Sequence, residues 1–220
     1  MFNRSLLFRS FLLRPLLFIA LTLFGAAATA APIAESPEQV RPLLNGMTVP
    51  AITVLDQQGQ AIDLTAKLQQ QPTVLVLYRG GWCPYCNTQL AGLQQVEAEF
   101  TKLGYQILAV SPEAPSAVQR SQQSTEKQPL SYQLYSDQSL TAATAFGIAY
   151  YLDAKTTAIY KNAYGITLTY DATGRAVLPA PAVYLINKEG EVVFSYVHVN
   201  YKSRLQPELL LLAAQLAAKR

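Results

Sequence analysis

The segment Arg79-Gly-Gly-Trp-Cys-Pro-Tyr-Cys86 most constrains the fold, because it contains both cysteines of the chain and separates two hydrophobic patterns. The residues before it, Thr73-Val-Leu-Val-Leu-Tyr78, form a continuous apolar run that predicts a central strand covered on both faces. The run after it has helical spacing and is followed by a second strand pattern, Tyr105–Ser111. Strand, helix and strand of these lengths predict a right-handed crossover and a parallel pair.

Both sulfurs are expected in the first turn of that helix. Cys83 can act as the N-cap, and Pro84 suits the first helical position because its missing N–H would have no intrahelical partner. The unpaired N–H groups and the helix dipole favour a thiolate, so the pKa of a cysteine in such a motif falls from about 8.5 to about 3.5–7.5. The pattern therefore predicts redox chemistry at Cys83 and Cys86.

The motif with its preceding strand resembles the thioredoxin-fold redoxins. The longer string from Leu77 to Asn87 is similar to peroxiredoxin-like proteins, of the alkyl hydroperoxide reductase and thiol-specific antioxidant type, that carry a Cys-x-x-Cys. The resemblance implies an α/β thioredoxin-like fold, with a central mixed sheet flanked by helices, over residues 51–220. It also implies that Pro181 is a cis-proline facing the cysteines, and that Trp82, Pro84, Tyr85 and Pro181 form the substrate-docking surface.

Other patterns place the remaining elements. Residues 52–55 and 61–64 predict an N-terminal hairpin around a glycine-containing turn, and residues 182–187 and 192–197 predict a second hairpin. An apolar stripe over residues 207–219 predicts a C-terminal helix. The tyrosine-rich insertion at 147–178 is either a helix and hairpin that pack their aromatic rings on the core, or a lid or partner-binding surface beside the cysteines.

The first thirty residues resemble a secretory signal peptide. Arg4, Arg9 and Arg14 precede a short apolar stretch, and Ala28 and Ala30 fit a cleavage site that leaves Ala31 as the new N-terminus. An uncleaved membrane anchor is the alternative, but its apolar core is shorter than the ~20 residues of a spanning helix. We expect an exported, periplasmic protein in which residues 31–50 form a lead-in segment. The formal net charge of +3 belongs to the leader, so a near-neutral mature chain gives no reason to expect nucleic-acid binding.

Two redox activities fit the motif. In the first, an exported thiol–disulfide oxidoreductase exchanges disulfides with proteins or small molecules, with the more exposed Cys83 as nucleophile and Cys86 as resolving cysteine. In the second, a peroxiredoxin-like thiol peroxidase reduces hydroperoxides. Superposing the peroxiredoxin string Pro-x-x-x-Thr-x-x-Cys places Cys86 at the peroxidatic cysteine, Cys83 at the threonine and Arg79 at the proline. The arginine that completes that site usually precedes the strand where this chain has Pro181. Either activity requires an external thiol or disulfide partner for recycling.

Two further alternatives need no redox catalysis. A purely structural disulfide would close a loop of about four residues and stabilise the fold by only about 2 kcal/mol. A non-enzymatic binding module is the other alternative, for copper or for a partner protein. For copper it would use Cys83, Cys86 and the single histidine, His198, a set that could suit Cu(I) but is incomplete for structural zinc. No cofactor and no metal are therefore predicted.

Overall fold

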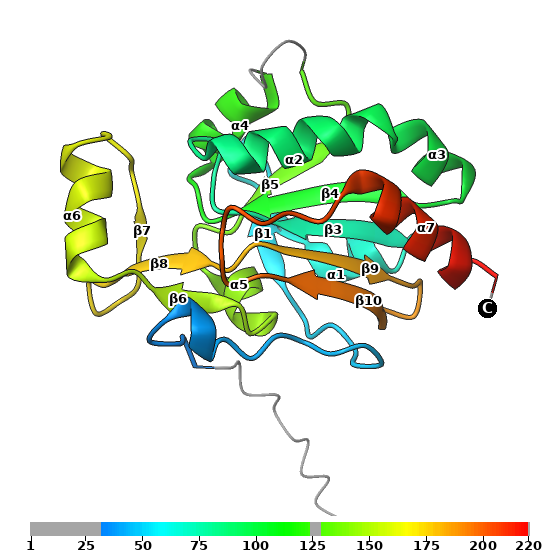
Figure 1. Ribbon diagram of the computed structural model, residues 1–220, viewed down its shortest axis with the longest axis horizontal. Helices are drawn as coiled ribbons and strands as arrows, with labels where there is room; N and C mark the ends of the chain where they lie inside the picture. The colour runs from blue at the N-terminus through cyan, green and yellow to red at the C-terminus, as the bar shows by residue number, and fades with distance from the viewer. Residues whose placement is uncertain (1–31, 124–128, 220) are drawn as a thin grey trace, which may run out of the picture.

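A computed structural model describes residues 32–123 and 129–219, and it confirms the predicted mixed α/β fold (Figure 1). The main sheet has seven strands in the order β10-β9-β3-β4-β5-β1-β2, with β3, β4 and β5 parallel and the other pairs antiparallel. Its strands are β1 (Thr53–Leu55), β2 (Ala61–Asp63), β3 (Thr73–Leu77), β4 (Gln106–Ser111), β5 (Gln133–Ser136), β9 (Ala182–Ile186) and β10 (Val192–Val197). Both predicted hairpins, β1–β2 and β9–β10, are therefore present.

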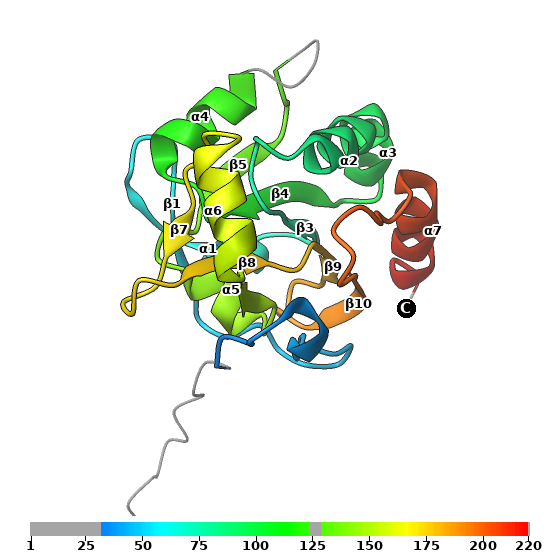
Figure 2. The same cartoon turned by 60° about the vertical axis from the view of Figure 1, so that its left-hand side comes forward.

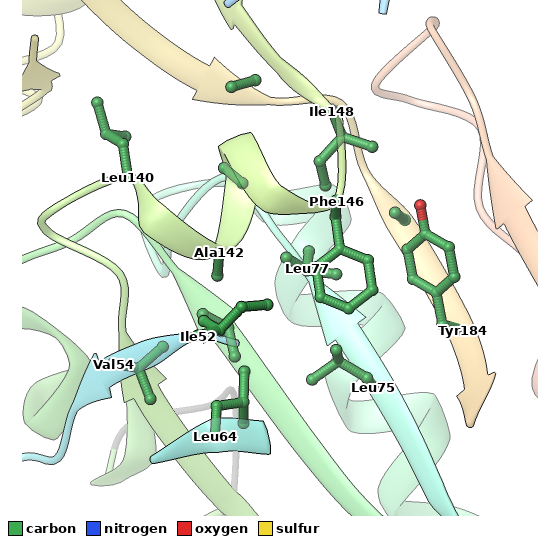
Figure 3. Close-up of a cluster of buried hydrophobic side chains, with 14 of the residues drawn as sticks. Ile52, Val54, Leu64, Leu75, Leu77, Leu140, Ala142, Phe146, Ile148 and Tyr184 are labelled. Carbon is green, nitrogen blue, oxygen red and sulfur yellow. The ribbon is translucent and has the colours of Figure 1, made fainter. Parts of the chain in front are cut away.

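Helices cover both faces of this sheet. One face is covered by α2 (Pro84–Gln95), α3 (Glu97–Lys102), α4 (Pro115–Gln123) and α7 (Pro207–Ala217), the other by α1 (Leu64–Leu68) and α5 (Thr141–Ala145). Leu75 and Leu77 of β3 point into the cluster under α1 and α5 (Figure 3), whereas Val74 and Val76 point into the opposite cluster. Burial on both faces explains why the β3 sequence is apolar without alternation.

The helix expected after the motif is divided into two. Val96 leaves the helical conformation at φ −112° and ψ 13°, so that α2 ends at Gln95 and α3 begins at Glu97. Gly104, at φ 82°, follows the end of α3 as predicted. In the lead-in segment the structure has a short 3₁₀ helix, η1 (Pro37–Gln39).

The tyrosine-rich insertion folds as the predicted helix and hairpin. It contains β6 (Ala149–Tyr151), α6 (Ala154–Asn162), β7 (Thr169–Tyr170) and β8 (Ala176–Pro179), and its strands form a separate sheet in the order β6-β8-β7. Figure 2 shows α6 standing upright in front of this small sheet. Tyr150 is buried in the core, but Tyr164 is 68% exposed, so the insertion packs only part of its aromatic surface inward.

The prediction that the peptide bond before Pro181 is cis is wrong, because no peptide bond in residues 32–123 and 129–219 is cis. The chain runs directly from β8 to β9 through Ala180 and Pro181, without the tight turn that favours a cis bond. The N–H of Ala180 donates to the Ile148 carbonyl, and the Pro181 carbonyl accepts from His198 N–H, which holds the extended path. Moreover, β9 pairs with β3 on one side and β10 on the other, so it offers no free edge to a substrate strand.

The predicted signal peptide lies outside the described residues. Within the part of the chain that the structure does describe, no helix combines the length and apolar character needed to span a bilayer.

Candidate active site

The cysteine motif follows β3 through two glycines, each required by its surroundings. Gly80 has φ +146°, which L side chains rarely adopt, and a Cβ on Gly81 would lie 1.9 Å from the Ser121 Oγ of α4. The Gly81 N–H donates to Glu113 Oε2 at 2.8 Å. As predicted, Cys83 is the N-cap and Pro84 is the first residue of α2. This turn places both sulfurs at the N-terminal, positive end of the α2 dipole.

Both cysteines are free thiols, and both are buried, with exposed fractions of 1% for Cys83 and 0% for Cys86. Cys83 is thus only marginally the more exposed of the two cysteines. Its pKa is nevertheless lowered to about 5 by hydrogen bonds from the side chain and the backbone N–H of Cys86, and then by the charges of Arg79 and Arg204, against an opposing effect of burial. The Cys83 sulfur is thus a thiolate at neutral pH.

Cys86 behaves in the opposite way. Burial raises its pKa well above the ordinary value, and the adjacent Cys83 raises it further. Arg204 Nη2 donates to the Cys86 sulfur at 3.3 Å, and Arg204 Nε lies 3.4 Å from the Tyr85 carbonyl oxygen. Cys86 therefore retains its proton and donates a hydrogen bond to the Cys83 sulfur.

Arg79, at the start of the motif, is only 2% exposed and lies in a cage of aromatic rings. Its Cζ is 5.1 Å from the centre of Trp82, 5.4 Å from that of Tyr160 and 4.2 Å from that of Tyr201. Arg79 Nη2 also donates to Tyr160 Oη at 2.8 Å. A guanidinium stacked on aromatic rings stays positively charged even where little water reaches it. Because little water surrounds Arg79, its charge acts on Cys83 with little screening by solvent.

The residues predicted to dock substrate have different environments. The Trp82 ring is half-buried and makes an edge contact with Tyr160 of α6, at 5.5 Å between centroids. Pro84 is exposed, and Tyr85 is 40% exposed with its ring 5.9 Å from that of Tyr201. Pro181 is buried and trans, so its predicted docking role loses its basis.

The three-ligand set considered for copper does not form. The described residues contain no group of three or more metal-ligating side chains, so His198 does not join Cys83 and Cys86 in a ligand set. Instead, His198 Nδ1 accepts from the Asn200 N–H, and its ring lies 6.1 Å from that of Tyr196.

Four residues of this site escaped the sequence analysis as functional groups: Arg79, Tyr160, Tyr201 and Arg204. In the sequence, Arg79 stood out only because it occupies the position of the proline in the peroxiredoxin string. The other three lie in segments without clear periodicity, the insertion and the loop between β10 and α7, and only the tertiary fold brings them to the cysteines. A cleft of about 820 Å³ lies beside the motif and is lined in part by Gly81, Trp82 and Tyr164, but neither cysteine lines it.

Comparison with known proteins agrees with this architecture. The AhpC/TSA family matches residues 46–195, which include both cysteines. The chain is 32% identical over 109 residues to the putative peroxiredoxin bcp of Haemophilus influenzae, covering 50% of this chain and 68% of that protein. It is 29% identical over the same length to peroxiredoxin Bcp of Escherichia coli, with 50% and 67% covered.

Solved structures show the same fold at low identity. Peroxidoxin BcpB from Mycobacterium tuberculosis superposes with a TM-score of 0.59 at 17% identity, over 78% of this chain and 96% of that one. Reduced Prx3 from Vibrio vulnificus, solved in complex with hydrogen peroxide, gives a TM-score of 0.62 at 16% identity, over 81% and 99%. With the thioredoxin-like fold and the buried dithiol, these matches establish that the chain belongs to the AhpC/TSA family and is an oxidoreductase of the peroxiredoxin-like, antioxidant type.

Proposed function

We propose that the protein is a thiol peroxidase in which the Cys83–Cys86 dithiol reduces a hydroperoxide and is recycled by an external thiol. The observation that carries this proposal is a buried pair of cysteines in which Arg204 contacts the Cys86 sulfur, while the charges of Arg79 and Arg204 help to lower the pKa of Cys83. A thiolate with exposed fraction 1% suits a small oxidant better than a protein strand. The similarity to peroxiredoxins supports the same substrate class.

The proposed reaction starts at Cys83. Its thiolate attacks one oxygen of the hydroperoxide, the O–O bond breaks, and Cys83 becomes a sulfenic acid while the departing alkoxide takes up a proton to become an alcohol. The guanidinium groups of Arg79 and Arg204 stabilise the negative charge that moves onto the departing oxygen. Arg79 Nε and Arg204 Nη1 are buried without hydrogen-bond partners, so both have a donor free for this role.

Cys86 completes the cycle. Its sulfur attacks the sulfenic sulfur of Cys83, an S–S bond forms and water leaves, so that the thiol proton ends in that water. An external thiol then reduces the disulfide. This assignment reverses the roles given by the peroxiredoxin string, which puts the attacking cysteine at Cys86, because the charges and hydrogen bonds favour the thiolate at Cys83.

Trapping of the sulfenic acid tests the assignment. One equivalent of cumene hydroperoxide is added to the Cys86→Ser variant in the presence of dimedone, and the adduct is located by peptide mass spectrometry. We expect a dimedone adduct on Cys83, because the resolving thiol is absent, and little adduct on Cys86 in the matched Cys83→Ser variant. Efficient trapping on Cys86 in Cys83→Ser would instead assign peroxide attack to Cys86.

Exchange of disulfides with proteins is the second candidate. It is favoured by the hydrogen bond between two cysteines with opposite pKa shifts, which is the arrangement that thiol–disulfide exchange requires. Burial of both sulfurs and the absence of a free edge on β9 make a docked substrate strand harder to accommodate. Catalysed reduction of insulin at a rate comparable with hydroperoxide turnover would favour this second function.

We also propose that the protein acts after export to the periplasm, with residues 1–30 removed. The observation behind this is the sequence pattern of three arginines, an apolar stretch and small residues up to Ala31. The full-length chain expressed in a bacterium with an outer membrane should appear in the periplasmic fraction with a mass that starts at Ala31. A chain that keeps Met1 and stays in the cytoplasm would contradict this proposal.

A further inference from the structure

Arg79 is a buried cation without a carboxylate partner. In residues 32–123 and 129–219 the one ion pair joins Arg175 and Glu35 on the surface. Glu113, the carboxylate beside the motif, accepts from Gly81 N–H and Ser111 Oγ instead. Aromatic rings and one tyrosine hydroxyl surround the Arg79 guanidinium, and its Nε has no hydrogen-bond partner. Tyr150, a further titratable neighbour, is neutral because burial raises its pKa.

Arg204 adds a second guanidinium to the same site. Its Nη2 contacts the Cys86 sulfur at 3.3 Å, and its Nη1 is buried without a partner. The loop that carries it also supplies Tyr201, whose ring covers Arg79. Arg204 therefore contacts the dithiol directly, and Arg79, four residues before Cys83, acts on it through its charge. The Cys83 thiolate is the group that can balance both cations.

The charge balance of the site thus depends on its redox state. A buried charge is costly when unpaired, so the two guanidinium groups stabilise the thiolate of the reduced form. Forming the Cys83–Cys86 disulfide removes that negative charge while both cations remain. The geometry consequently stabilises the reduced form relative to the disulfide, which makes the disulfide easier to reduce.

We infer that Arg79 and Arg204 make the Cys83–Cys86 disulfide strongly oxidising, so that a small monothiol suffices to recycle it. Two monothiols reduce the disulfide: the first forms a mixed disulfide, the second releases it as the monothiol's own disulfide. The products are the Cys83 thiolate, one proton and the Cys86 thiol. The recycling role rests on the proposed peroxidase function, but the redox equilibrium can be measured without any peroxide.

Equilibration of the full chain with glutathione buffers tests the inference. The measured constant is that for reduction of the protein disulfide by two glutathione molecules, from the fraction of protein alkylated after acid quenching. For the wild type we expect a constant about 10²-fold or more above that of a thioredoxin in the same buffers. Arg79→Met should lower it about tenfold or more, equivalent to about 30 mV.

Three variants separate charge from structure. Arg79→Lys keeps a positive charge but loses the stacked guanidinium plane, so we expect its constant to fall less than that of Arg79→Met, whereas exposed Arg41→Met should leave the constant unchanged. If Arg79→Met fails to fold, Arg204→Met should lower the constant in the same direction. A folded Arg79→Met protein with an unchanged constant, or equal changes in Arg79→Lys and Arg79→Met, would overturn the inference. Loss of peroxidase activity alone would leave it intact.

Discussion

Replacing Cys83 by serine is expected to lower the steady-state rate of hydroperoxide reduction by about 10³-fold or more, because removing the nucleophile of a covalent mechanism removes the chemical step itself. Serine keeps the size and the N-cap position, so α2 should still begin at Pro84. A serine hydroxyl does not ionise at neutral pH. The measurement is the consumption of cumene hydroperoxide with excess external thiol, together with far-ultraviolet circular dichroism to verify the fold.

Cys86→Ser is the matched variant for this prediction. It should still consume about one equivalent of hydroperoxide in the first turnover, because Cys83 remains, and should then slow down because no internal thiol resolves the sulfenic acid. The two variants thus differ in the first turnover and not only in the final rate. A Cys83→Ser protein with normal turnover beside an inactive Cys86→Ser protein would assign the peroxidatic role to Cys86, as the peroxiredoxin string suggests.

Alkylation of Cys83 is expected to be almost independent of pH between 6 and 8. With its pKa at about 5, the thiolate fraction of Cys83 changes by only about 1.1-fold over this interval, whereas that of an ordinary thiol with pKa about 8.5 rises about 75-fold. The rate should be half-maximal near pH 5. Iodoacetamide labelling followed by peptide mass spectrometry gives the rate at each cysteine separately.

The pH profile is more informative than the rate at neutral pH. A thiolate of low pKa is also a weaker nucleophile, with a Brønsted slope of about 0.4–0.5, which offsets most of the gain in thiolate fraction at pH 7. The same pKa shift also determines how the stability of the reduced, folded protein changes with pH. Because the pKa of Cys83 is lower when folded, the stabilisation of the reduced form is present above the unfolded pKa and is lost as pH falls through about 5.

Cys86→Ala provides the control for the pH profile. It removes the hydrogen bond that contributes most to lowering the pKa of Cys83, and it leaves Cys83 as the only thiol of the chain. Its half-maximal rate should therefore move to higher pH, while Arg79 and Arg204 keep the value below that of a free cysteine. A wild-type profile that climbs to a plateau only above pH 8 would remove the electrostatic basis of the proposed mechanism.

Local patterns predicted most of the fold because they reflect constraints that act over a few residues. The apolar run of β3 required cover on both faces, the glycine-containing turns set the two hairpins, and Pro84 fixed the start of α2. The family resemblance came from the same contiguous string. The cis bond at Pro181 was wrong because that expectation assumed a tight turn, whereas the chain passes straight from one sheet to the next.

The sequence by itself determined that two cysteines lie at the first turn of a helix after a central strand, since strand, turn and helix are adjacent along the chain. Only the tertiary structure decided their electrostatics. Tyr160 comes from the insertion, and Tyr201 and Arg204 come from a loop more than a hundred residues after the motif, so no local spacing marks them. Burial of the dithiol and the placement of cations around it depend on packing between these distant segments, which distinguishes the two cysteines as thiolate and thiol.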